Sequence, residues 1–193
     1  MNFLAHLHLA HLAKSSLTGN LLADFIRGDP NGRWTAAVVD GIHMHRRLDS
    51  LSDKLPEVRE AKQLFTLPTR RVAPIALDVI WDHFLARDWS ILHKEIKLSD
   101  FCLMAEQSIS SDLASTPENF RQLNQLIWSQ HWLERYAHAE NLENVLRQMA
   151  QRRPRLASLA ECYHDFVIHY ADLEALFYRF YPQLMQRAKE NRL

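Results

Sequence analysis

Apolar residues recur along most of the chain at intervals of three and four, the spacing of a helix that buries one face. The stripe formed by Ile75, Asp78, Asp82, Leu85 and Trp89 shows this spacing most clearly. Strict alternation of apolar and polar residues, which indicates a β-strand, is rare. The pattern therefore predicts an all-α chain with helices at 2–13, 17–28, 35–53, 57–66, 71–92, 99–113, 118–138, 141–150, 155–180 and 182–191.

Glycine and proline mark the predicted boundaries. All four glycines lie within the first 41 residues, and most prolines coincide with predicted breaks, namely Pro30, Pro56, Pro117, Pro154 and Pro182. The sequence contains no internal repeat, low-complexity tract or linker. Short connections between antiparallel helices predict a compact single-domain helical bundle that spans residues 1–193.

Composition narrows the class of protein. Hydrophobic residues make up 47% of the chain, and 23 basic residues balance 23 acidic ones, so no global charge favours nucleic acid or an anionic membrane. Cys102 and Cys162 lie far apart in the sequence, and a single pair of cysteines in a chain of this size is typical of reduced thiols. The apolar N-terminal stretch has no basic leader and is too short to span a bilayer. We therefore expect a soluble, cytoplasmic protein that binds neither nucleic acid nor membrane.

Two carboxylates occupy positions on the 75–89 stripe where packing would favour leucine. An ionised aspartate buried without a partner is costly, and no Lys or Arg lies on the same stripe. Asp78 and Asp82 therefore require a cation from elsewhere, and His83 adds a nitrogen ligand at the edge of the stripe. We favour a metal ion, and the arginines of the 35–53 helix are the alternative.

The segment GIHMHRRLDSLSD, residues 41–53, is the densest in candidate functional groups. His45 and Asp49 lie one helical turn apart, so they can hold one ion together, or Asp49 can orient the imidazole of His45. Arg46 and Arg47 offer paired donors that suit a phosphate. The alternative is an ordinary amphipathic helix with ion pairs along its surface.

The first two predicted helices offer further ligands. His6, His8 and His11 lie on the first, and Asp24 lies at the margin of the apolar face of the second, where Arg27 is an alternative partner. Imidazole and carboxylate together suit Mn, Fe, Co, Zn or Mg better than copper. Helical bundles build metal sites from such side chains on facing helices, so the sequence predicts a mixed histidine and carboxylate metal centre.

Several of these segments also carry a family resemblance, namely MNFLAHLHLAH, GNLLADFIRG, GIHMHRRLDSLSD, LPEVREA, RRVAPIALDVIWDHFL and QRRPRL. Together they resemble the acyl carrier protein phosphodiesterase family. The resemblance implies hydrolysis of the phosphodiester between phosphopantetheine and a serine of acyl carrier protein, giving the apo carrier and 4′-phosphopantetheine. It also implies manganese dependence and a relation to the all-helical HD metallo-phosphohydrolases, although Asp82-His83 reverses the His-Asp doublet of that superfamily and leaves the ligands open.

Diester hydrolysis needs a nucleophile, neutralisation of the phosphoryl oxygens and a proton for the leaving alkoxide. We hypothesise Mn²⁺ as the ion, with Mg²⁺, Fe²⁺ or Co²⁺ as alternatives. The predicted metal ligands are Asp24, His45, Asp49, Asp78, Asp82 and His83, with Asp49 either binding the ion or orienting His45. The predicted catalytic groups are Arg46 or Arg47 on the phosphate and His43 or His6 as proton donor.

The expected partner is the holo form of acyl carrier protein, which is small and acidic. Recognition of such a carrier should use arginines at the mouth of the site, and the candidates are Arg70, Arg71, Arg147, Arg152, Arg153 and Arg155. Two alternatives stay open. The first is a metal-dependent phosphohydrolase of a nucleotide or other small phosphate ester. The second is a non-catalytic helical interaction module whose aspartates are neutralised by arginine.

Overall fold

The chain is helical throughout its described part. The computed structural model describes residues 1–152 and 154–193, so Arg153 of the predicted basic cluster lies outside the described residues. Within that part no strand occurs, which confirms the all-α prediction. The α-helices are α1 (Phe3–Leu12), α2 (Leu17–Leu22), α3 (Ala36–Ser52), α4 (Pro56–Gln63), α5 (Leu67–Arg70), α6 (Ala73–Arg87), α7 (Trp89–Leu92), α8 (Leu98–Ser110), α9 (Glu118–Ser129), α10 (Trp132–Arg135), α11 (Ala139–Arg152), α12 (Cys162–Ile168) and α13 (Tyr170–Lys189). The 3-10 segments are η1 (Ala23–Phe25), η2 (Leu113–Ser115) and η3 (Pro154–Glu161).

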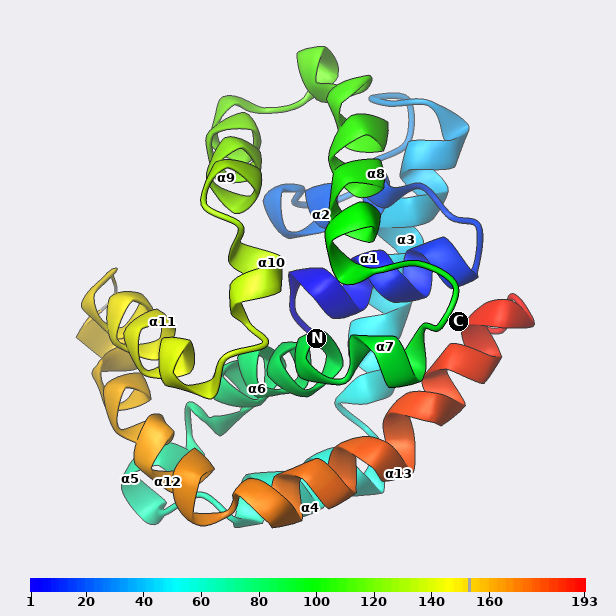
Figure 1. Ribbon diagram of the computed structural model, residues 1–193. Coiled ribbons are helices and arrows are strands. Elements are labelled where there is room, and N and C mark those ends of the chain that lie inside the picture. The colour runs from blue at the N-terminus through cyan, green and yellow to red at the C-terminus, as the bar shows by residue number, and fades with distance from the viewer. Residues whose placement is uncertain (153) are drawn as a thin grey trace.

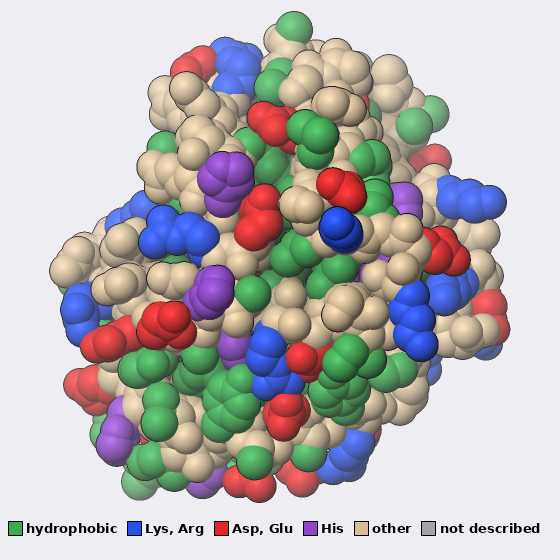
Figure 2. Space-filling view, viewed as in Figure 1, with side chains coloured by type: hydrophobic (Ala, Val, Ile, Leu, Met, Phe, Trp, Pro, Cys, Tyr) green, Lys and Arg blue, Asp and Glu red, His purple; other side chains and the backbone are tan. Residues whose placement is uncertain are grey.

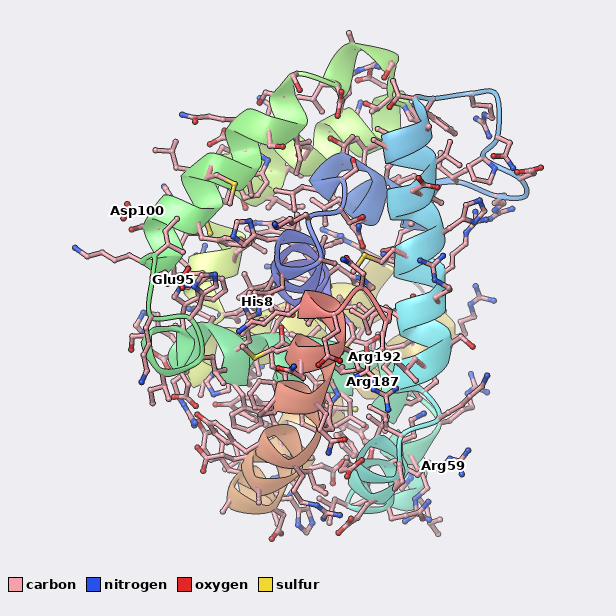
Figure 3. The ribbon with its side chains drawn as sticks, turned by 90° about the vertical axis from the view of Figure 1, so that its right-hand side faces the viewer. His8, Arg59, Glu95, Asp100, Arg187 and Arg192 are labelled. Atoms are coloured by element: carbon pink, nitrogen blue, oxygen red, sulfur yellow. The ribbon has the colours of Figure 1, made fainter. Side chains whose placement is uncertain are left out.

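Helix α1 is the centre of the fold. Its residues from Leu4 to Ala10 are all buried, so this helix has no solvent-facing polar stripe there. It packs against α2, α3, α6 and α13, and Figure 1 shows it crossing the middle of the molecule. His6 and His8 therefore lie in the interior, where their ring nitrogens need partners. Figure 3 shows His8 inside the molecule, whereas Arg59 and Asp100 lie at its periphery.

Two glycines allow α2 and α3 to touch. A Cβ atom at Gly41 would lie 2.9 Å from the carbonyl oxygen of Ser16 and 3.0 Å from the Cα of Gly19. A Cβ at Gly19 would lie only 2.3 Å from the carbonyl oxygen of Val38. Because only glycine permits this approach, α2 and the following η1 lie directly against α3, and Asp24 of η1 comes near the middle of α3.

The structure divides several predicted helices. The 118–138 segment forms α9 and α10, which separate at His131 in the left-handed region with φ 51°. The 71–92 segment forms α6 and α7, the 17–28 helix ends as η1, and the 155–180 segment begins as the 3-10 segment η3. The break predicted at Pro182 is wrong, because α13 continues through it. Burial of Phe180, Tyr181 and Leu184 offsets the hydrogen bond that proline removes there.

The buried apolar side chains form one core. The cluster runs from Leu4 to Ala188 and draws on helices from both ends of the chain, as a compact single-domain bundle requires. Figure 2 shows acidic and basic side chains interspersed on one face, in keeping with the balanced composition. In the described residues, no helix combines the length and the apolar composition that crossing a bilayer demands. The predicted relation to the HD phosphohydrolases stays a prediction.

Candidate metal centre

Three histidine and aspartate side chains from α1 and α3 converge on one point. The Nε2 atom of His6 lies 3.1 Å from Oδ1 of Asp49, and the Nε2 atom of His45 lies 3.1 Å from Oδ2 of the same carboxylate. Asp24 of η1 joins them, with its Oδ1 atom 3.2 Å from Nε2 of His45. The ligand atoms of His6, His45 and Asp49 all lie within 4.8 Å of one another, the geometry of a metal half-site.

The centre is buried beneath and open above. The side chains of His6 and His45 are only 2% and 5% exposed, whereas those of Asp49 and Asp24 are 41% and 57% exposed. Buried imidazoles thus form the floor, and the carboxylates form a mouth that faces solvent. This arrangement leaves an approach for a substrate from the carboxylate side.

A backbone carbonyl sets the orientation of His45. The Nδ1 atom of His45 donates to the carbonyl oxygen of Asn20 at 2.7 Å, so the Nε2 atom is the one that faces Asp24 and Asp49. This is the outer-shell contact that metal-binding histidines commonly make through their second nitrogen. The sequence gives no side-chain signal for this contact, because the partner is a main-chain atom of α2.

The two carboxylates of the cluster favour positive charge on His45. Burial opposes protonation of His45, but its hydrogen bonds to Asp24 and Asp49 outweigh burial and raise the pKa of His45 to about 9. Burial lowers the pKa of His6 to about 4 despite its hydrogen bond to Asp49. Burial alone would raise the pKa of Asp49, but its hydrogen bonds to His45 and His6 hold that pKa well below its usual range.

These residues fit a divalent cation. Carboxylate oxygens only accept hydrogen bonds, so a neutral His45 with Nδ1 donating to Asn20 would aim its Nε2 lone pair at two further acceptors. The rings of His6 and His45 stack with centroids 3.7 Å apart, so protonating both would set two cations face to face. One divalent ion facing both Nε2 atoms and the carboxylate oxygens would satisfy all of them, and a mixed nitrogen and oxygen set is one that divalent metals accept.

Asp78 lies beside the cluster rather than in it. Its Oδ1 atom accepts from the α-amino group of Met1 at 2.8 Å, and the same amino group lies 3.5 Å from Oδ1 of Asp49. Burial raises the pKa of Asp78, although the amino group opposes this effect. The amino group thus links Asp78 to the cluster, which places the predicted ligand at the margin of the centre.

Asp82 does not join the cluster, which corrects the prediction that it binds metal there. It is fully buried, its Oδ2 atom accepts the N–H of Leu4 at 2.8 Å and its Oδ1 atom accepts the N–H of Ala5 at 2.9 Å. These are free N–H groups of the first turn of α1, and the N-cap residue Asn2 makes no side-chain bond to them. Asp82 therefore caps α1 from α6, although burial raises its pKa to about 7. Backbone donors, rather than a metal, satisfy both of its oxygens.

His83 also lies outside the cluster, contrary to the prediction. Its Nδ1 atom lies 2.7 Å from the carbonyl oxygen of Tyr136, and its Nε2 atom lies 2.9 Å from the hydroxyl of Tyr170. Both ring nitrogens are thus used in contacts with the start of α13 and the end of α10. His83 follows Asp82 on α6 and points about 100° away from it, because consecutive helical residues face different directions.

The predicted phosphate ligands and one proton donor line a different face of α3. A shallow groove is lined by His43, Arg46 and Arg47, which point in other directions around the helix axis than His45 does. Arg46 donates to the carbonyl oxygens of Gly28 at 2.9 Å and Ile26 at 2.8 Å, and Arg47 donates to the carbonyl oxygen of Leu193. The structure therefore does not bring these three residues to the cluster. Arg46 instead anchors the segment that follows Asp24.

The other predicted proton donor, His6, lies in the centre itself as a candidate ligand. The sequence offered three histidines on the first helix, and only packing distinguishes them. His8 contacts the hydroxyl of Tyr181 at 2.9 Å in the core, on another side of α1. The predicted ligands that the structure brings together are therefore Asp24, His45 and Asp49, and His6 completes them.

Comparison with known proteins agrees with the resemblance seen in the sequence. A family model described as acyl carrier protein phosphodiesterase matches residues 1–184, a range that contains the whole candidate centre. The chain belongs to the acyl carrier protein phosphodiesterase family. Proteins of that name from Klebsiella pneumoniae (strain 342), Escherichia coli O157:H7 and Enterobacter sp. (strain 638) are each 53% identical to it over 193 residues, the full length of both chains in each pair. No solved structure matches the chain.

Proposed function

We propose that this chain hydrolyses the phosphodiester of holo-acyl carrier protein, releasing the apo carrier and 4′-phosphopantetheine, with a divalent ion held by His6, His45, Asp49 and Asp24. Membership of the acyl carrier protein phosphodiesterase family supports the reaction. The observation that carries the metal is the convergence of two stacked imidazoles on one carboxylate. When bound, the ion supplies Lewis acidity toward the phosphoryl oxygens and activates water for attack.

The residues around the centre support the proposal of a bound cation. A phosphodiester is an anion, and Asp24, Asp49 and Asp78 surround the mouth through which it must enter. Without a compensating cation these carboxylates would repel the substrate at short range. The Asn20 carbonyl holds His45 in place, and Arg46 holds the backbone after Asp24, so both sides of the mouth are preorganised.

The carrier would dock on the arginines near α5 and η3. Arg71 donates to the carbonyl oxygen of Arg155 at 3.1 Å, which brings two of the predicted basic segments side by side. Arg147 is paired with Glu143, so it contributes less free charge to the surface. Attraction between exposed arginines and an acidic carrier would mainly accelerate association and would weaken with added salt.

We also propose that the protein acts in the cytoplasm. Cys102 and Cys162 are both free and buried, as expected for a chain that works under reducing conditions. Burial also raises the pKa of each thiol, Cys162 to about 12, so neither is a reactive thiolate.

A mass measurement tests the reaction and its metal. Holo carrier is incubated with the metal-stripped protein, with and without added Mn²⁺, and conversion to the apo form is followed by mass spectrometry. We expect conversion only with the ion, and at least a roughly 100-fold loss of kcat/KM in His45→Gln, because removing a ligand costs more than the 10–100-fold typical of outer-shell partners. Asp53→Asn is the control, since Asp53 is an exposed residue of the same region that pairs with Lys62.

Four outcomes distinguish the alternatives. If the wild-type protein leaves holo carrier unchanged at every metal tested, the proposed reaction is wrong. Turnover of small phosphate esters in that case would favour a general phosphohydrolase, and failure to retain any divalent ion after purification would favour an interaction module. Equal activity with and without a strong chelator would remove the metal from the proposal.

A further inference from the structure

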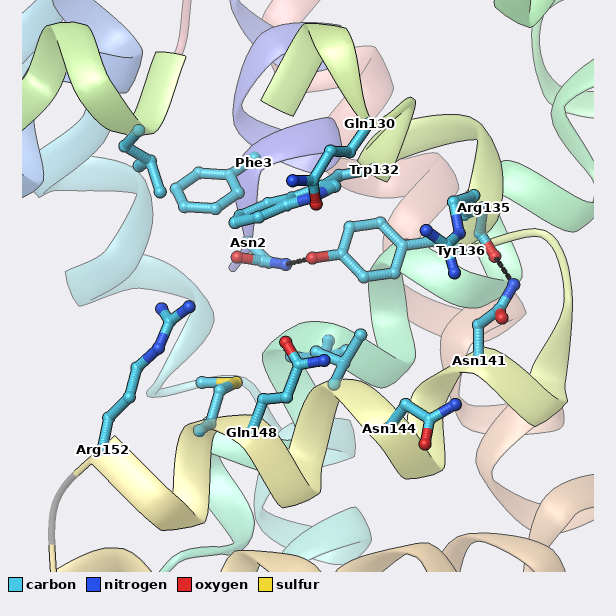
Figure 4. A pocket seen from close by; sticks show the side chains of 14 residues that line it. Asn2, Phe3, Gln130, Trp132, Arg135, Tyr136, Asn141, Asn144, Gln148 and Arg152 are labelled. Carbon is cyan, nitrogen blue, oxygen red and sulfur yellow. Dashed lines mark hydrogen bonds between the residues drawn. The ribbon is translucent and has the colours of Figure 1, made fainter. Parts of the chain in front are cut away.

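Close to the candidate centre lies a pocket that the reaction chemistry leaves unassigned. It has a volume of about 220 Å³ and is formed by the start of α1, by α6 and by the α9–α11 segment (Figure 4). Pockets that enclose drug-sized ligands usually measure about 300–1,000 Å³. The smaller volume suits a slender, linear ligand.

The lining combines amide groups with apolar surface. Five carboxamide side chains face it, from Asn2, Gln130, Asn141, Asn144 and Gln148. Each carboxamide offers both a donor and an acceptor, so together they can pair with either side of a ligand amide. No acidic residue lines the pocket within the described part of the chain.

Aromatic and aliphatic side chains line the pocket between the carboxamides. Phe3 and Trp132 lie over the pocket opposite α11, while Val145 and Met149 present apolar surface from α11 itself. The lining positions on α11 recur at steps of three and one, which places them on one face of the helix. A ligand that alternates amide groups with short apolar segments matches this surface.

Two of the carboxamides are free to bind. Asn2 donates to the hydroxyl of Tyr136 at 3.2 Å, and Asn141 donates to the carbonyl oxygen of Arg135 at 2.9 Å. Asn144 and Gln148 are exposed and make no side-chain hydrogen bond to another described residue. The first pair therefore shapes the wall, and the second pair is available to a ligand.

The pocket adjoins the centre through two adjacent residue pairs. Asn2 lines the pocket, and its neighbour Met1 places its amino group 2.8 Å from Asp78 and 3.5 Å from Asp49. Val79 lines the pocket and follows Asp78 directly on α6. Since consecutive Cα atoms are about 3.8 Å apart, the wall of the pocket begins one residue from Asp78 and one residue from the amino group that contacts Asp49.

We propose that this pocket holds the pantetheine arm of the substrate while its phosphodiester lies at the candidate centre. The inference rests on the proposed function, because that function supplies a substrate with such an arm. The arm is a linear chain with two amides, short methylene segments and a branched dimethyl group, so it presents the alternation that the lining accommodates. Arg135 and Arg152 are the charged residues of the described lining and the rest of it is neutral, as suits a neutral arm that joins an anionic phosphodiester to a thiol.

Binding of pantetheine alone tests the pocket without turnover. Pantetheine is titrated into the metal-free protein by isothermal calorimetry, and the same protein is assayed with holo carrier and Mn²⁺. We expect Gln148→Met to weaken pantetheine binding and to raise the KM for holo carrier by about two- to tenfold, the effect of one hydrogen bond, with kcat little changed. Asn144→Trp should abolish pantetheine binding by filling the pocket from an exposed position.

Gln151→Met is the matched control, because Gln151 is exposed on the same helix but does not line the pocket. It should leave pantetheine binding and the KM unchanged. The inference is overturned if pantetheine does not bind the wild type, or if Asn144→Trp binds it equally well. Failure of the wild type to convert holo carrier is a separate result that overturns the proposed function, whatever pantetheine does.

Discussion

Substitution of Asp82 by alanine distinguishes a helix cap from a metal ligand. The change removes the acceptors of the Leu4 and Ala5 N–H groups, which are buried at the start of α1. An unsatisfied buried N–H costs about 1–3 kcal/mol, so two of them should cost about 3 kcal/mol or more in the free energy of unfolding. For a chain of this size, 3 kcal/mol lowers Tm by about 6–12 °C.

The assay pairs a thermal melt followed by circular dichroism with metal titration. Asp82→Ala should lower the Tm of the metal-free protein while the folded fraction still binds Mn²⁺ at low temperature. Asp49→Ala should act mainly on metal binding, because its carboxylate is 41% exposed and contacts both imidazoles. We expect Asp49→Ala to weaken Mn²⁺ binding strongly and to lower Tm less than Asp82→Ala does, because it leaves no buried backbone N–H group without its acceptor.

One combination of Tm and Mn²⁺ affinity would refute the capping role of Asp82. An Asp82→Ala protein with the wild-type Tm and no Mn²⁺ binding would show that Asp82 is a ligand, as its place on the inward stripe of α6 predicted. Asp82→Asn serves as an intermediate variant, since its amide oxygen can accept only one of the two N–H groups. Its Tm should fall between those of the wild type and Asp82→Ala.

Two further predictions concern packing and pH. Gly41→Ala places a Cβ 2.9 Å from the Ser16 carbonyl oxygen, so it should lower Tm and also weaken Mn²⁺ binding by moving Asp24 away from α3. Asp40→Ala, on the exposed side of the same helix, is the control. An unchanged Mn²⁺ affinity in a folded Gly41→Ala protein would contradict the argument. Burial lowers the pKa of His8 well below its ordinary value of 6.5. Below about pH 6.5 the unfolded state therefore binds a proton that the folded state does not. His8 leaves the free energy of unfolding unchanged above that pH and lowers it as the pH falls further. Measured by urea unfolding at each pH, His8→Gln should reduce the slope of the unfolding free energy between pH 6 and 5 by up to about 1.4 kcal/mol per pH unit, and an unchanged slope would contradict the argument.

Local periodicity was enough to predict the all-α class and one half of the centre. His45 and Asp49 lie one turn apart on a single helix, so their proximity follows from 3.6 residues per turn before any tertiary contact forms. The same spacing correctly placed Asp82 on the buried face of α6. It could not say what would satisfy that carboxylate, because its partners are backbone N–H groups of α1, which no side-chain pattern reveals.

The sequence by itself determined an all-α chain, the His45 and Asp49 pair, and the family, because each follows from residue spacing or from similarity along the chain. Only the tertiary structure decided that His6 rather than His83 joins this pair, since that choice depends on which face of α1 meets α3. Packing of α2 against α3 at Gly19 and Gly41 likewise brings Asp24 to the centre. Contacts between helices far apart in sequence arise from the shape of whole packed surfaces, and one helix's periodicity contains no information about its neighbours.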